Sequence, residues 1–258
     1  MEVRDKRPGR QRRFQRGASI LPSLFTTGNL FLGFWSIIRT LEGRFEMAAA
    51  LVGGSIVLDM LDGRIARLTG TSSEFGAQLD SLSDAVSFGV APALLAFRWA
   101  LDELPRVGWL AAFWFAMCGV LRLARFNVQH NTADMRYFVG LPIPAAAGQL
   151  ATLVYFLPDP VTDRVQALGV LAGVVVVGTL MVSTLRYRSF KGIDLRARRS
   201  YINILGIAGL FLVVAVHPET ALLCVATLYT ISGPTAYVAG LLRRRSDPPP
   251  AVVTGPAH

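Results

Sequence analysis

Long apolar stretches separated by short polar segments fill most of this chain. Eight such stretches can be marked, each of roughly 17–24 residues, the length at which a helix crosses a hydrocarbon core of about 30 Å. Their bounds are residues 21–41, 46–68, 79–101, 107–127, 141–158, 165–186, 201–217 and 219–242. The pattern predicts an all-α, polytopic membrane protein.

The start of the fifth stretch carries two prolines, Pro142 and Pro144. Two interpretations fit this position. Either the prolines break the span, or an ordinary helix begins here with a proline in its first turn, where the missing N–H group leaves no hydrogen bond unmade.

The amino-acid composition supports a membrane protein. Hydrophobic residues make up 52% of the 258 residues and charged residues only 17%, against roughly 25% charged residues in soluble domains. These proportions exclude an intrinsically disordered chain, a coiled coil and an ordinary cytosolic enzyme. The two cysteines, Cys118 and Cys224, both lie inside apolar stretches, which indicates small buried side chains rather than a disulfide framework or a zinc site.

Positive charge gathers in clusters next to the apolar stretches. The formal net charge is +9, and basic residues crowd residues 4–16, 186–199 and 243–245. Cytoplasmic loops of membrane proteins have this excess of Arg and Lys, which attracts anionic lipid headgroups. We therefore expect membrane lipids, and no nucleic acid, as the partner of these clusters. The same bias predicts the cell (inner) membrane as the location, with both termini cytoplasmic.

This orientation divides the chain into three parts. Residues 1–20 are expected to form a basic cytoplasmic tail with an interfacial segment, because they are too charged to enter the hydrocarbon core. Residues 21–242 are expected to form the transmembrane domain of about eight helices, which would also carry any catalytic site. Residues 243–258, rich in Pro and small side chains, are expected to form a disordered cytoplasmic tail.

Four aspartates interrupt the second and third apolar stretches. Asp59 and Asp62 are three residues apart, and Asp80 and Asp84 are four apart, so each pair lies on one face of its helix. Each such residue at mid-membrane costs on the order of 2.5–3.5 kcal/mol on insertion scales. Residues that carry this cost usually mark a functional site. The spacing predicts that two neighbouring helices direct four carboxylates at one point near the cytoplasmic face.

A cluster of carboxylates without His or Cys suits a divalent cation such as Mg²⁺, Mn²⁺ or Ca²⁺. Such ions commonly assist phosphoryl transfer, and Arg67 on the same face is a natural phosphate partner. Gly63 and Gly76 lack side chains, which allows a bulky ligand to approach the backbone. As an alternative, the aspartates could form buried salt bridges with Arg64, Arg67, Arg122 and Arg125.

The aspartates belong to a longer motif. It reads Asp59-x-x-Asp62-Gly63-x-x-Ala66-Arg67, then eight residues, then Gly76-x-x-x-Asp80-x-x-x-Asp84. This string resembles the full signature of the CDP-alcohol phosphatidyltransferases at every fixed position. The resemblance implies a core of six membrane helices, to which this chain adds about two C-terminal transmembrane helices. It also implies transfer of a phosphatidyl group from a CDP-linked lipid to an alcohol with release of CMP.

The resemblance also implies roles for the motif residues. One or two divalent cations, Mg²⁺ or Mn²⁺, are held at the positions of Asp59, Asp62, Asp80 and Asp84. Asp84 matches the proposed general base. The CDP-lipid is bound at the positions of Gly63, Ala66, Arg67 and Gly76. Members of the family are usually homodimers.

Sequence beyond the motif suggests the acceptor. Residues 68–76, 84–93, 121–127 and 140–147 resemble the membrane-embedded phosphatidylserine synthases, and the similarity extends over about 22–150. The implied reaction joins CDP-diacylglycerol and L-serine to give phosphatidylserine and CMP.

Three polar residues end the fourth apolar stretch near the expected site. Arg122, Arg125 and Asn127 could bind the carboxylate of serine, or they could be topology anchors that reach lipid headgroups. Three other functions also remain open. The same chemistry could use glycerol 3-phosphate or an inositol phosphate as acceptor. The carboxylates could instead line the path of a cation transporter, or the chain could be a non-catalytic membrane scaffold.

Overall fold

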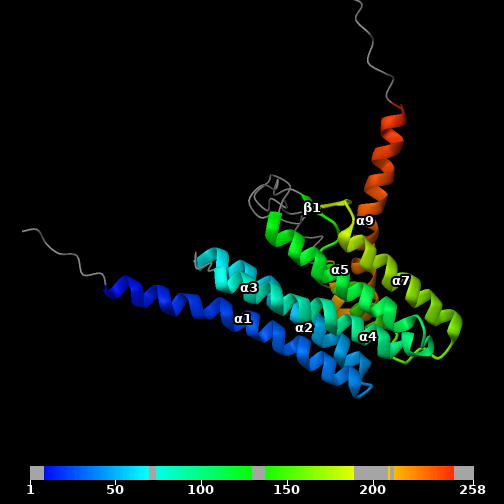
Figure 1. Ribbon diagram of the computed structural model, residues 1–258, viewed down its shortest axis with the longest axis horizontal. Helices are drawn as coiled ribbons and strands as arrows, with labels where there is room; N and C mark the ends of the chain where they lie inside the picture. Colours follow the sequence, from blue (N-terminus) through cyan, green and yellow to red (C-terminus); the bar gives the residue numbers. More distant parts are fainter. Residues whose placement is uncertain (1–8, 70–73, 130–136, 189–208, 210–211, 247–258) are drawn as a thin grey trace, which may run out of the picture.

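Long helices packed against one another make up almost all of the described part of the chain (Figure 1). The computed structural model describes residues 9–69, 74–129, 137–188, 209 and 212–246. The long helices are α1 (Gly9–Leu41), α2 (Phe45–Thr69), α3 (Glu74–Asp84), α4 (Ala91–Trp99), α5 (Gly108–Gln129), α6 (Ile143–Phe156), α7 (Arg164–Val182) and α9 (Pro218–Ser246). The prediction of an all-α protein is confirmed, with two three-residue strands as the exception.

The helices coincide with the predicted apolar stretches, except that 201–217 lies largely outside the described residues. The third predicted stretch begins five residues earlier, at Glu74, and the first and last described helices also extend further than predicted. The helix of α1 begins at Gly9 and α9 continues past residue 242 to Ser246. The extensions of α1 and α9 are rich in Arg, a good helix former, so the basic flanks continue these helices instead of ending them. The remaining tail residues, 1–8 and 247–258, lie outside the described residues.

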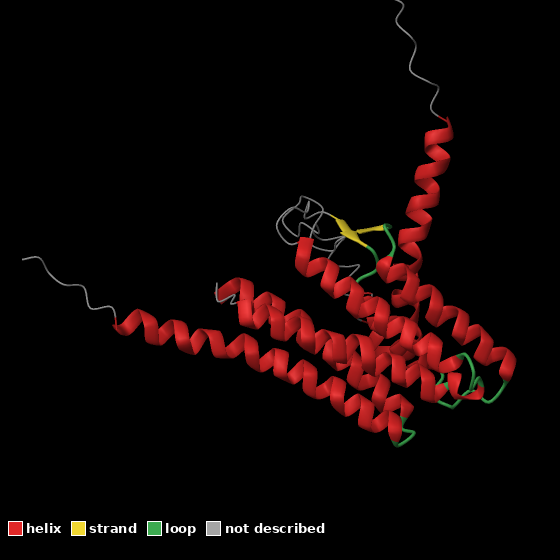
Figure 2. Cartoon of the chain, in the orientation of Figure 1, coloured by secondary structure: helices red, strands yellow, loops and turns green. Residues whose placement is uncertain are grey.

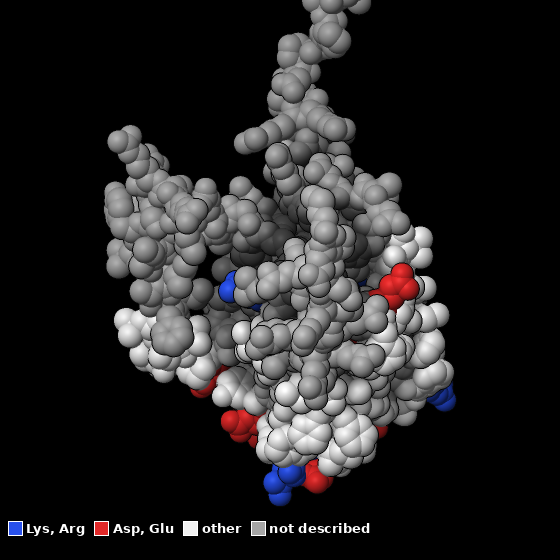
Figure 3. Space-filling model, turned by 90° about the vertical axis from the view of Figure 1, so that its left-hand side faces the viewer, with Lys and Arg blue, Asp and Glu red and all other residues white. Residues whose placement is uncertain are grey.

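Large apolar side chains are exposed on many of the described helices. Four described helical segments are long and apolar enough to cross a membrane, namely Glu74–Trp99, Gly108–Val128, Arg164–Val182 and Pro218–Ala239. The described atoms in the space-filling view are mostly uncharged, with few acidic or basic side chains among them (Figure 3). Large apolar side chains such as Trp109 and Phe113 are more than half exposed. Such a surface fits a lipid environment, and the chain is a membrane protein.

Two short strands close one end of the bundle (Figure 2). Strand β1 (Tyr137–Val139) pairs antiparallel with β2 (Arg186–Arg188). Gly140 follows β1 with φ of +81° and lies so close to the Met181 carbonyl that a side chain there would clash. The helix α6 then begins at Ile143 with Pro144 in its first turn. Of the two interpretations of these prolines, the ordinary helix start is therefore the one observed.

Connections on the opposite end contact one another. The indole Nε1 of Trp99, at the end of α4, donates to the Asp159 carbonyl at 2.8 Å, and the Val161 amide donates to the Trp99 carbonyl at 2.9 Å. Here the short 3-10 helix η2 (Leu101–Glu103) precedes α5. The loops 100–107 and 157–163 therefore share one end of the bundle, as the predicted topology requires.

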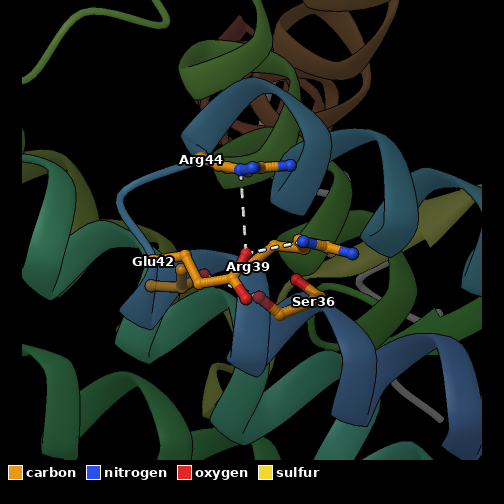
Figure 4. A network of polar contacts seen from close by, with 5 residues as sticks. Ser36, Arg39, Glu42 and Arg44 are labelled. Carbon is orange, nitrogen blue, oxygen red and sulfur yellow. Dashed lines mark hydrogen bonds and ion pairs between the residues drawn. The ribbon is translucent and has the colours of Figure 1, made fainter.

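Charged side chains hold the turn between α1 and α2 (Figure 4). Glu42 accepts from Arg39 at 2.6 Å and lies 3.7 Å from Arg44. One turn earlier, buried Ser36 donates to the Ala48 carbonyl of α2 at 2.8 Å. These contacts join α1 and α2 into a hairpin, at whose other end the site lies.

The third membrane segment changes its helical winding next to the aspartates. Helix α3 continues as a π-helix, η1 (Ala85–Val90), before α4 begins. Within η1 the Ser87 hydroxyl donates to the Asn29 carbonyl of α1 at 3.0 Å. Gly33 of α1 faces the backbone of Ser87 so closely that any side chain would overlap it. A π-helical turn often marks a functional site, and here it brings α1 directly against the third segment.

Candidate active site

Helices α2 and α3 bring three carboxylates together. Asp59 of α2 and both Asp80 and Asp84 of α3 each offer a carboxylate oxygen, and these oxygens lie within 4.8 Å of one another. Asp59 and Asp80 are partly buried and Asp84 is only 8% exposed. Three carboxylates this close repel one another, and burial strengthens the repulsion. The arrangement fits a divalent cation, because clustered carboxylate oxygens are the donor set that Mg²⁺ and Mn²⁺ prefer.

Asp62 lies beside this cluster and not within it. Its carboxylate is 6% exposed and accepts a hydrogen bond from the Thr26 hydroxyl of α1. It is still close enough to repel Asp59 and Asp80 electrostatically. The sequence predicted four converging carboxylates, whereas the structure groups three and directs the fourth toward α1.

The arginines whose side chains the structure describes do not neutralise the aspartates. Among those side chains, no ion pair joins an arginine to Asp59, Asp62, Asp80 or Asp84. Arg64 is exposed and Arg122 lies within electrostatic range of Asp84. The side chains of Ala66 and Arg67 lie outside the described residues. The alternative of buried salt bridges therefore has no support from the arginines that the structure describes.

A polar network from α1 holds Asp84. The Asn29 amide, fully buried, donates through Nδ2 to Asp84 at 3.0 Å, and its Oδ1 accepts from the Ser55 hydroxyl of α2. In addition, Ser83 donates to the Thr26 carbonyl at 3.1 Å. Both the nitrogen and the oxygen of the Asn29 side-chain amide are therefore hydrogen-bonded, and this residue of α1 fixes the position of the Asp84 carboxylate.

Sequence reasoning missed Thr26, Asn29 and Ser55. A signal was present, since Thr26-Thr27-Gly28-Asn29 places polar and small residues inside an otherwise apolar stretch. Polar side chains inside a membrane helix face the protein interior, as these do.

Gly63 of the motif leaves the site open on one side. A Cβ built at Gly63 would meet no atom within 4 Å, so the space over this face of α2 is free for a ligand. Gly63 is one residue from Asp62 and four from Asp59. Gly76 lies one turn before Asp80 on α3 and is half-buried.

Polar side chains of helix α5 lie near helix α3. Asn127 exchanges hydrogen bonds with Ser81, donating at 3.1 Å and accepting at 3.3 Å, next to Asp80. Arg122 interacts electrostatically with Asp84, and its buried Nε has no hydrogen-bond partner. Arg125 is partly buried one turn further along α5. The structure thus places Arg122 within electrostatic range of Asp84, and Asn127 against Ser81, the neighbour of Asp80 in the sequence.

The sequence of this chain is similar to those of known proteins over most of its length. A family model described as CDP-alcohol phosphatidyltransferase matches residues 19–186. A CDP-diacylglycerol–serine O-phosphatidyltransferase from Helicobacter pylori is 38% identical over 219 residues, which are 83% of this chain and 89% of the relative.

Two further relatives carry the same name. The protein from Methanocaldococcus jannaschii is 35% identical over 191 residues, covering 74% of this chain and 84% of that protein. The one from Bacillus subtilis is 34% identical over 171 residues, covering 66% and 91%. The matched region contains α2, α3 and α5, which supply the clustered carboxylates and the polar side chains around them. This chain belongs to the CDP-alcohol phosphatidyltransferase family.

Proposed function

We propose that this protein transfers the phosphatidyl group of CDP-diacylglycerol to the hydroxyl of L-serine, giving phosphatidylserine and CMP. The observation that carries the proposal is the cluster of Asp59, Asp80 and Asp84, built on the family motif in a chain whose relatives are named for this reaction. Glycerol 3-phosphate and inositol phosphate are the competing acceptors, since they would require the same cluster.

Asp59, Asp62, Asp80 and Asp84 are the proposed ligands of Mg²⁺ or Mn²⁺. When bound, the cation supplies positive charge that stabilises the pyrophosphate and the departing CMP. Gly63, Ala66, Arg67 and Gly76 form the proposed surface for the CDP moiety, and the open space over Gly63 supports this assignment.

Asp84 is the proposed general base. It takes the proton of the serine hydroxyl, the serine oxygen bonds to the phosphorus that carries the diacylglycerol, and the bond from that phosphorus to the CMP oxygen breaks. The hydrogen bond from Asn29 orients the carboxylate for this step. Arg122, Arg125 and Asn127 are the proposed binding residues for serine, with Arg122 pairing with its carboxylate.

The experiment is CMP release by the purified protein in detergent with CDP-diacylglycerol and Mn²⁺ or Mg²⁺. L-Serine, glycerol 3-phosphate and inositol phosphate are added in separate reactions. We expect release that depends on serine and metal, and that is lost in Asp84→Asn and after chelation with EDTA. Release with a phosphorylated acceptor alone would overturn serine as the substrate, and cation flux into liposomes without CMP formation would favour a transporter.

We further propose an inner-membrane homodimer with both termini in the cytoplasm. The basic clusters support this orientation, because most of the 26 lysines and arginines then lie on the cytoplasmic side. Cysteine labelling from either side of the membrane tests the orientation, and the mass of the protein–detergent complex tests the dimer.

A further inference from the structure

A groove lies between α6, α7 and α9, and none of the motif aspartates lines it. Its volume is about 420 Å³, and ligand pockets in proteins commonly measure about 300–1,000 Å³. The lining includes Leu150 and Leu153 of α6, Val170 and Val174 of α7, and Ile231 of α9. Because Ile231 is 49% exposed, the groove opens to the outside of the bundle.

The groove offers little to a polar ligand. Among the lining residues that the structure describes, the polar side chains are those of Gln149, Gln166, Thr227 and Thr230. Three of them bond to one another. Gln149 donates from Nε2 to the Thr227 hydroxyl at 3.2 Å and accepts through Oε1 from the Thr230 hydroxyl at 3.3 Å. The other described lining residues are aliphatic or glycine, so hydrocarbon fits this space better than water, which needs several polar partners.

The groove extends over about half the thickness of a membrane. Helix α7 is long and apolar enough to cross a membrane, and its lining residues run from Gln166 to Val177. That distance along the helix is about 16 Å at about 1.5 Å per residue, whereas a hydrocarbon core is about 30 Å thick. The length of the groove therefore matches a lipid chain of one leaflet.

The groove begins at the end of the bundle that is remote from the carboxylates. Gln166 lies near the start of α7, directly after loop 157–163, which contacts Trp99 at the end of α4. Asp84 lies before the start of the same membrane segment's α4, toward the other end of the bundle. A CDP-lipid bound at the carboxylates therefore has its acyl chains in one leaflet, while the groove opens in the other.

The size of the groove favours an acyl chain over a helix of a second copy. A helix with its side chains is about 10–12 Å across and rises about 5.4 Å per turn, so about one turn would fill the volume. A helix seated here would thus use about one of the five or more turns with which it crosses a membrane. An acyl chain is narrower and flexible, and it can follow the groove along its whole length.

We propose that the groove between α6, α7 and α9 binds one acyl chain of a membrane phospholipid from the leaflet remote from the active site. The chain contacts Val174 of α7 and Ile231 of α9 together, so the bound lipid joins these two helices by dispersion contacts. Helix α9 lies beyond the region matched by the family model and packs against α6. The lipid adds an attachment of α9 to α7, and the inference does not depend on the proposed reaction.

The test is Gly173→Phe, which places a ring in the groove. A Cβ built at Gly173 meets no atom within 4 Å, so the ring enters without displacing the backbone. Leu168→Phe is the matched control, because it adds the same ring to α7 at a position that is 52% exposed and does not line the groove. Each protein is purified in detergent, washed free of lipid, and melted with and without dioleoyl phosphatidylglycerol.

We expect the phospholipid to raise the melting temperature of the wild type and of Leu168→Phe by about 5–10 °C at about 100 times its dissociation constant. The rise in Gly173→Phe should be less than about 2 °C, because the ring occupies the space of the chain. Ile231→Trp fills the groove from α9 and should lose the response as well. It keeps the test decisive if Gly173→Phe does not fold.

Three outcomes would overturn the inference. The first is an equal response to phospholipid in the two filled variants and in Leu168→Phe. The second is a protein–detergent complex of Gly173→Phe that is smaller than that of the wild type, since the groove would then hold a second copy. The third is a KM for CDP-diacylglycerol that rises in Gly173→Phe but not in Leu168→Phe, since the groove would then hold a chain of the substrate.

Discussion

Asn29 controls the position of Asp84, and its replacement by alanine tests this role. The amide is fully buried, donates to Asp84 and accepts from Ser55. In Asn29→Ala the carboxylate loses its donor, and Ser55 loses an acceptor. The fold is retained around a small cavity, but nothing on α1 then orients the carboxylate.

The size of the effect follows from the hydrogen bond that is lost. A hydrogen bond to a charged group contributes about 1.5–3 kcal/mol. Because about 1.4 kcal/mol corresponds to a tenfold change in rate, we expect kcat to fall about 10–100-fold if the bond serves to align Asp84. The KM for CDP-diacylglycerol should change little, since Asn29 does not line the open face over Gly63.

The assay is CMP release at saturating serine and CDP-diacylglycerol, with thermal unfolding followed in the same detergent. Ser36→Ala is the matched control. Ser36 is also a buried polar residue of α1 that bonds to α2, but it lies at the distant end of the hairpin. Both variants should lose stability, by about 1–3 kcal/mol for a buried polar group left unpaired. Only Asn29→Ala should lose kcat beyond what unfolding explains, and a kcat within about threefold of wild type would refute the reasoning.

Three further replacements test other contacts. Thr26→Val removes the donor to Asp62, so the Mn²⁺ concentration for half-maximal activity should rise several-fold in a metal titration, and an unchanged value would separate Asp62 from metal binding. Gly63→Ala should raise the melting temperature slightly, because alanine favours a helix by about 0.5–1 kcal/mol over glycine, but it should also raise the KM for CDP-diacylglycerol. Gly169→Ala is the control, also at an open position, and should raise the melting temperature without changing that KM. Gly33→Ala places a methyl group against the backbone of η1 and should destabilise the protein by about 1–3 kcal/mol in thermal unfolding, whereas unchanged stability would mean that η1 yields easily.

Local pattern predicted the helices and most of the site. The lengths of the apolar stretches predicted where the helices lie, and the spacing of the aspartates predicted that each pair shares one helical face. Both features can be predicted because they depend only on residues that are close in the sequence. The convergence of Asp59, Asp80 and Asp84 follows from two consecutive helices joined by a short connection.

Other parts of the site depend on packing between distant segments. Thr26 and Asp62, which share a hydrogen bond, are 36 residues apart in the sequence, and Asn29 and Asp84 are 55 residues apart. No local pattern specifies which helix lies beside which in a bundle. The same applies to α9, whose attachment to the core depends on contacts made by Gln149 and Tyr187, residues without a motif of their own.

The π-helix η1 also determines the direction in which the side chains of α3, Asp80 and Asp84 among them, point relative to α4. A π-helical turn accommodates about one residue more than an α-helical turn, and each residue of a helix advances the side-chain direction by about 100°. The carboxylates of α3 precede η1, while the side chains that anchor the segment in the core, including Leu95 and Trp99, follow it. Loss of a single residue from 85–90 would leave the apolar character of the segment intact and rotate Asp80 and Asp84 away from Asp59. The length of this one turn is therefore as strict a requirement for the carboxylate cluster as the identity of its three aspartates.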